Sequence, residues 1–147
     1  MAPHNKTNKG GDMIQPLLSA MSLAGMFLVL GLTPTAIAEE KPDITNIGFV
    51  LYTKSYASGT LNARWMSTDK HRGPGIATGG PAEGYAGKYH VRYFYESGEF
   101  SDEYDLIIEK TEDVYRAFWL VDGETRAIGV GMEVENGLAI GWRRVTN

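Results

Sequence analysis

Apolar and polar residues alternate along nearly the whole chain after Asn46, and turn-forming residues interrupt the alternation at short intervals. A period of two is the pattern of strands that bury one face. From residue 39 onward no segment has a helical period. We therefore expect an all-β fold, with strands at residues 47–53, 60–66, 75–78, 88–95, 104–109, 114–121, 125–134 and 138–144.

Eight short strands joined by short turns predict a single small antiparallel up-and-down β-barrel over residues 47–147. A sheet of eight strands closes comfortably, and closure removes the exposed edges that invite aggregation. A β-sandwich made of the same strands is the alternative. The Gly- and Pro-rich residues 73–87 form the longest interruption, and we expect a mobile loop there at one mouth of the barrel.

Residues 1–38 have the organisation of a bacterial signal peptide. A polar, basic start precedes an apolar run at residues 17–32, and the segment ends in the small-residue pattern Ala36-Ile37-Ala38. The run is shorter than the ~20 residues of a spanning helix, which favours cleavage over retention as an anchor. We expect a periplasmic or secreted protein with no stable membrane anchor after cleavage, in which residues 39–46 are a polar leader.

The chain contains no cysteine, so neither a disulfide nor a lipid-anchoring cysteine is available after export. The domain must therefore rely on core packing. In the whole chain 14 Lys and Arg are outnumbered by 18 Asp and Glu, and the formal net charge is −4. This balance argues against nucleic acid as a partner, because phosphate binding needs a basic face. Met1 and Met13 both remain candidate starts.

Two predicted hairpins organise the second half of the chain. The dipeptide Asn136-Gly137 predicts a two-residue type I′ turn, which places Gly131 opposite Trp142. A three-residue loop at 122–124 places Trp119 opposite Ala127. One face then combines aromatic residues with glycines, as the interior of a small barrel does. This predicted inner face carries Tyr115, Ala117, Trp119, Gly129, Gly131, Leu138, Ile140 and Trp142.

The opposite face of these hairpins is also apolar, although a monomeric barrel needs one apolar face. It carries Val114, Phe118, Leu120, Ile128, Val130 and Met132, with Arg116 and Arg143 among them. Two explanations are open. A homo-oligomer covers this face, or the loop at 122–124 is one residue out of register, which exchanges the faces.

The spacing of aromatic and glycine residues resembles that of a family of small exported bacterial β-proteins of uncharacterised function. The matching positions cover about 60 residues and include Gly87-Lys88-Tyr89, Tyr93-Phe94, Gly129-x-Gly131-Met132 and Gly141-Trp142. In size and strand number the chain is also similar to calycin and avidin-like barrels. These resemblances imply a meander of strands and carry no active site or ligand.

We predict no catalytic residue, no metal site and no cofactor from the sequence. There is no nucleophile elbow, and no serine is oriented against a histidine. His90 alternates with its basic neighbours on a strand and is expected to face outward. Glu99, Asp102, Glu103 and Asp105 cluster around one predicted turn, where a solvated acidic loop is favoured over a weak calcium site.

Aromatic residues are the remaining candidates for function, either as barrel core or as the lining of a pocket at one mouth. In the second case tyrosine hydroxyls or an arginine would hold the polar end of a small ligand. The candidate ligand-binding residues are Arg64, Trp65, Arg92, Tyr93, Tyr115, Trp119 and Trp142.

We therefore expect an exported, non-catalytic binding or interaction protein that holds a small apolar or amphipathic ligand or a protein partner. One alternative is a small barrel enzyme of cyclase or isomerase type that acts by shaping an apolar substrate. The other alternative is a structural envelope protein with a filled core.

Overall fold

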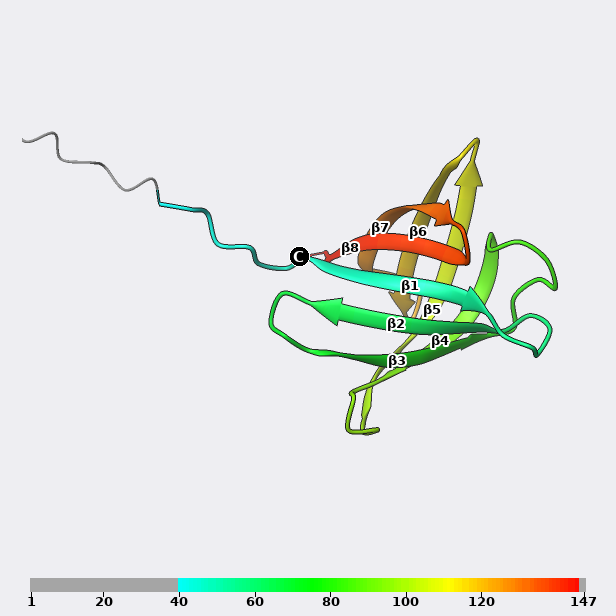
Figure 1. Cartoon of the computed structure of the whole chain (residues 1–147), viewed down its shortest axis with the longest axis horizontal. Helices are drawn as coiled ribbons and strands as arrows, with labels where there is room; N and C mark the ends of the chain where they lie inside the picture. Colours follow the sequence, from blue (N-terminus) through cyan, green and yellow to red (C-terminus); the bar gives the residue numbers. More distant parts are fainter. Residues whose placement is uncertain (1–39, 146–147) are drawn as a thin grey trace, which may run out of the picture. The chain divides into compact units, whose positions relative to one another are not determined.

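The computed structural model describes residues 40–145, which form a closed barrel of antiparallel strands in up-and-down order (Figure 1). This confirms the all-β class and the barrel, and excludes the sandwich. The predicted signal peptide and the last two residues lie outside the described residues. The strands are β1 Gly48–Lys54, β2 Leu61–Ser67, β3 Arg72–Thr78, β4 Gly87–Phe94, β5 Phe100–Thr111, β6 Val114–Val121, β7 Glu124–Val134 and β8 Gly137–Arg144.

The barrel closes through β1, which pairs with β2 on one side and with β8 on the other. Along each strand, alternate side chains point inward and bury the apolar residues that the period-two pattern marks. The core includes Val50, Tyr52, Leu61, Val91, Leu106, Ile108, Ala117, Leu138 and Ile140. Within residues 40–145 the structure holds no helix long and apolar enough to cross a membrane.

The β6–β7 hairpin has the predicted pairing, with Trp119 opposite Ala127. A register shift between Trp119 and Leu120 precedes a tight turn in which Asp122 and Gly123 both have positive φ. The turn has one residue fewer than the predicted loop, and the register shift compensates for this difference. The inner and outer faces of β6 and β7 are therefore the predicted ones. The predicted inner face is the true interior, and Val130 and Met132 are 60% and 64% exposed on the outside.

The predicted β7–β8 register is wrong by two residues. Gly131 lies opposite Ile140 and Gly129 opposite Trp142, so the turn residues are Glu135 and Asn136. A two-residue slip leaves every side chain on its face, so alternation does not detect it.

The glycines involved in this register have packing roles. A Cβ on Gly137 would lie 2.5 Å from the Tyr52 carbonyl oxygen on β1, so a close approach of strands requires glycine there. A Cβ on Gly48 would overlap the ring of Trp142, so Trp142 covers Gly48 rather than Gly131.

Two further sequence expectations need correction. The loop predicted at 73–87 is too long, because β3 runs from Arg72 to Thr78 and β4 begins at Gly87, which leaves residues 79–86 as the connection. Position 75 on β3 requires glycine, because a Cβ there would lie 2.6 Å from the Tyr93 ring. β5 begins at Phe100, so Asp102, Glu103 and Asp105 lie on a strand rather than around a turn.

Candidate functional site

The two ends of the barrel differ in how they are closed. The connections at residues 68–71, 95–99 and 122–123 surround one end, which we call the open end. The connections at 55–60, 79–86, 112–113 and 135–136 surround the other, which we call the Tyr85 end. Up-and-down topology places alternate connections at opposite ends, so each end draws on residues far apart in the sequence.

At the open end the interior retains a cavity of about 70 Å³. Its aromatic walls come from five strands, because each ring occupies an inward position near the same end of its strand. The lining residues are Trp65, Tyr93, Asp102, Tyr104, Trp119, Arg126, Ala127, Trp142 and Arg144. On the same measure a water molecule needs about 10–15 Å³, so the cavity suits a small group rather than a large ligand.

A buried hydrogen-bond chain fixes the floor of this cavity. The Trp119 indole Nε1–H donates to the Tyr93 hydroxyl at 2.8 Å, and the Tyr93 and Tyr52 hydroxyls lie 2.5 Å apart. Burial raises the pKa of both tyrosines above the ordinary value, so both stay neutral. These polar atoms satisfy one another within an apolar core, and the rings that carry them are held in place.

A second indole is anchored at the side of the cavity. The Trp65 Nε1–H donates to the Phe94 carbonyl oxygen at 3.1 Å, and its ring meets the Tyr93 ring edge-on, with centroids 6.1 Å apart. Tyr104 packs against Tyr93 in turn, with ring centroids 6.3 Å apart. The aromatic walls are therefore preorganised by contacts within the barrel.

Three charged side chains complete the lining. Arg126 is paired with Glu124, with Nη2 and Oε2 2.9 Å apart, and the Asp102 carboxylate accepts a hydrogen bond from the Ser101 hydroxyl at 2.7 Å. Within residues 40–145, Arg144 makes no ion pair through its side chain.

The electrostatics at Tyr104 show how two of these charges are placed. Burial raises the pKa of the Tyr104 hydroxyl, the Asp102 carboxylate raises it further, and the Arg144 guanidinium lowers it. Asp102 and Arg144 therefore both act on one hydroxyl, and in the described part of the chain no ion pair joins them. Opposite charges thus lie unbonded to each other at the rim of an aromatic cavity.

The structure brings four of the predicted ligand-binding residues together at this cavity, namely Trp65, Tyr93, Trp119 and Trp142. Tyr115 is also inside the barrel but lies at the Tyr85 end, where its hydroxyl donates to the Glu133 carboxylate.

The two predicted arginines lie on the outer surface of the barrel and do not line the cavity. Arg64 pairs with Glu96 at 3.1 Å between Nη2 and Oε1. Arg92 lies over the rings of Phe94 and Phe100, 5.4 Å from each centroid.

Sequence reasoning missed the three charged residues that do line the cavity. Arg144 follows the inward positions of Leu138, Ile140 and Trp142 at a spacing of two, so alternation along β8 was a usable signal. Arg126 is different, because it is the extra residue at the β6–β7 register shift, and no sequence pattern indicated that position.

The Tyr85 end is covered by the connection between β3 and β4. Tyr85 packs against the core, and its carbonyl oxygen accepts a hydrogen bond from the Tyr89 hydroxyl at 2.8 Å. The backbone N–H of Gly80 donates to the carbonyl of Gly59 at 3.0 Å, which ties this connection to the neighbouring one. The Lys54 ammonium also lies 5.2 Å from the Tyr85 ring centroid.

Comparison of the chain with protein-family models, with curated proteins and with solved structures found no match. The site is therefore interpreted from its own chemistry. Over residues 40–145, no group of three or more histidine and acidic side chains is arranged to hold a metal ion. His90 is half-exposed on the outer surface, with its ring nitrogens 3.2 Å from Glu103 and 3.4 Å from Asp105.

Proposed function

We propose that this chain is an exported, non-catalytic binding protein that holds a small amphipathic ligand in the cavity at the open end. The observation that carries the proposal is the convergence of aromatic side chains from five strands on one cavity with charged groups at its rim. Binding sites commonly combine apolar walls with a few placed polar groups in this way. Export is predicted from residues 1–38, and the resemblance to small exported β-proteins is consistent with it.

The chemistry of the lining favours holding over turnover. A general acid or base needs a pKa near the working pH, whereas burial raises the pKa of Tyr93 and Tyr104 further from neutrality. Their hydroxyls therefore act as neutral hydrogen-bonding groups. A cyclase or isomerase is the enzymatic alternative, and turnover of a bound apolar substrate would support it.

Native mass spectrometry and tryptophan fluorescence test the proposal, using protein purified from bacteria that express the full chain. We expect a small bound molecule, and we expect its addition to change the emission of the three tryptophans that line the cavity. Ala127→Phe places a ring in the cavity and should abolish both signals. Ala57→Phe introduces the same ring on the exposed β1–β2 connection and is the matched control. Equal ligand occupancy in the two variants would contradict a cavity site.

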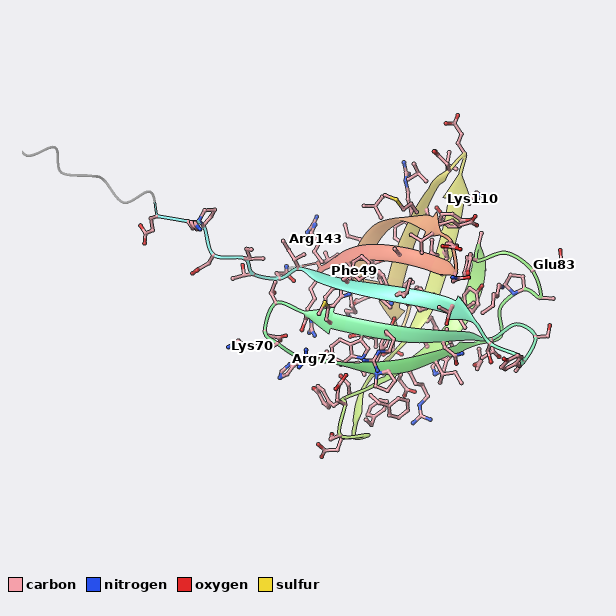
Figure 2. All side chains as sticks on the ribbon, viewed as in Figure 1. Phe49, Lys70, Arg72, Glu83, Lys110 and Arg143 are labelled. Carbon is pink, nitrogen blue, oxygen red and sulfur yellow. The ribbon has the colours of Figure 1, made fainter. Side chains whose placement is uncertain are left out.

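A specific observation favours a second role, association of two copies through the outer wall. We use that name for the outer faces of β1, β6, β7 and β8, which carry the exposed Phe49, Val114, Val130 and Met132, the half-buried Phe118 and Ile128, and the arginines Arg116 and Arg143 (Figure 2 labels Phe49 and Arg143). A groove of about 550 Å³ crosses this wall. Its floor includes Gly141, where an added Cβ would have no atom within 4 Å.

We infer that a second copy of the chain covers this wall. Val130 lies directly opposite Gly141 on the neighbouring strand, so a protruding valine side chain lies beside a position that has no side chain. A two-fold rotation seats Val130 of each copy over Gly141 of the other, which is the self-complementarity that an isologous interface needs. Exposed apolar patches on soluble proteins commonly mark such contacts.

Sedimentation velocity across a concentration series tests this association. We expect a dimer that Val130→Lys converts to a monomer. Ile76→Lys is the control, because Ile76 is exposed on the outer face of β3, away from the wall, and this variant should remain dimeric. A wild-type protein that stays monomeric at all concentrations would overturn the inference.

A further inference from the structure

The charges at the rim of the open-end cavity restrict the class of ligand. Asp102 and Arg144 both line the cavity and are not paired with each other, and Arg126 is partly neutralised by Glu124. A ligand that carried a single charge would leave one of the two rim charges unmatched. A dipolar ligand would satisfy both, with its cation toward Asp102 and its anion toward Arg144.

The aromatic walls favour a cation inside the cavity. Tryptophan is the side chain that attracts a cation most strongly through its ring face, and Trp65, Trp119 and Trp142 all line this site. The carboxylate of Asp102 adds a negative charge at the same place. The guanidinium of Arg144 suits a carboxylate, which it can bind through two parallel hydrogen bonds.

The hydrogen-bonding capacity of the lining restricts the cation further. A primary ammonium brings three N–H donors that need acceptors. The Tyr93 hydroxyl is already engaged by Trp119 and Tyr52, and the Asp102 carboxylate already accepts a hydrogen bond from Ser101. Only the rest of the Asp102 carboxylate's capacity and the Tyr104 hydroxyl therefore remain as side-chain acceptors of the lining. A fully methylated ammonium has no N–H to satisfy, and it presents an apolar surface to the rings. A cavity of about 70 Å³ also suits a compact head group.

We propose that the open end binds a small betaine, a methylated ammonium joined to a carboxylate by a short linker. The ammonium lies among the tryptophan rings beside Asp102, and the carboxylate binds Arg144 at the rim. This assignment rests on the proposed binding function, and it names the chemical class of the ligand.

Isothermal titration calorimetry with three probes tests the assignment, using the protein purified from bacteria that express the full chain. Glycine betaine carries both charges, 3,3-dimethylbutanoate has the same shape and carboxylate without the cation, and choline has the cation without the carboxylate. We expect glycine betaine to bind at least about tenfold more tightly than either of the others, as expected where two charge contacts act together.

Two pairs of variants separate the charge contacts. Asp102→Asn should weaken glycine betaine about tenfold and leave 3,3-dimethylbutanoate unchanged, whereas Arg144→Gln should weaken both carboxylates and leave choline unchanged. Asp105→Asn on the outer face of β5 and Arg64→Gln on the outer face of β2 make the same changes away from the cavity and should have no effect. Circular dichroism and thermal unfolding check that each variant is folded.

The outcomes distinguish the ligand class from the proposed function. Equal affinity for glycine betaine and 3,3-dimethylbutanoate would overturn the role of the cation and leave a cavity for small acids. Failure of all three probes to bind would overturn the betaine class. The binding function itself would fail only if native mass spectrometry also found no bound molecule that Ala127→Phe excludes.

Discussion

Removing the Tyr93 hydroxyl is expected to destabilise the barrel strongly. In Tyr93→Phe the Trp119 Nε1–H loses its acceptor, and the Tyr52 hydroxyl loses its partner. Tyr52 is fully buried, so water cannot replace the lost bond without entering the core. An unsatisfied buried polar group costs about 1–3 kcal/mol, so two such groups give a loss of about 2–6 kcal/mol in the free energy of unfolding.

Urea unfolding monitored by far-ultraviolet circular dichroism measures this loss. The midpoint should fall while the dependence on urea concentration stays unchanged, because the surface exposed on unfolding is nearly the same. In thermal unfolding, roughly 4 °C for each kcal/mol predicts a decrease in Tm of about 8–24 °C. Tyr56→Phe is the matched control, because Tyr56 is fully exposed and should change stability little.

The double variant Tyr52→Phe with Tyr93→Phe tests the connection between the two hydroxyls. Removing the second hydroxyl should cost less than removing it from the wild-type protein, because its partner has already gone. Additive losses, or a Tyr93→Phe protein as stable as Tyr56→Phe, would refute the hydrogen-bond chain as a stabilising feature.

Two other expectations concern pH and packing. Burial raises the pKa of Tyr89 to about 12, above the value near 10 that tyrosine has in the unfolded chain. The contribution of neutral Tyr89 to the free energy of unfolding should therefore be fully present below pH 10 and decrease as the pH rises toward 12. Urea midpoints measured at pH 8, 10 and 11 check this, and a constant midpoint would contradict it. Gly131→Val should lower the unfolding midpoint clearly, because the valine Cβ would overlap the Ala139 carbonyl oxygen. Glu135→Gln in the exposed β7–β8 turn is the control and should have little effect. Equal midpoints for the two variants would mean that the β7–β8 register is wrong.

Part of the site was predictable because alternation decides which face of a strand a side chain occupies. Trp65 and Tyr93 were correctly expected inside the barrel. The same rule argued against Arg64 and Arg92, since each immediately precedes one of these rings and successive side chains point to opposite faces. The strand pattern therefore already placed both arginines on the outer surface, on the opposite face from the aromatic side chains that line the cavity.

Other features had no signal in the sequence because they depend on pairing between strands. The β7–β8 slip preserves every face, and it became visible only where Gly137 meets Tyr52 and where Trp142 covers Gly48. The cavity likewise needs Asp102 from β5 and Arg144 from β8 at the same end of the barrel. These two side chains come together only because the sheet closes, and the register of every strand between them sets where they meet.

The sequence by itself determined the all-β class, the order of the strands and the inner face of the second half, because a period of two and the turn residues act locally. The tertiary structure decided which rings meet, which end is covered and which charges reach the cavity. These outcomes depend on strand register around a closed sheet, where a shift of two residues keeps every face and changes every neighbour.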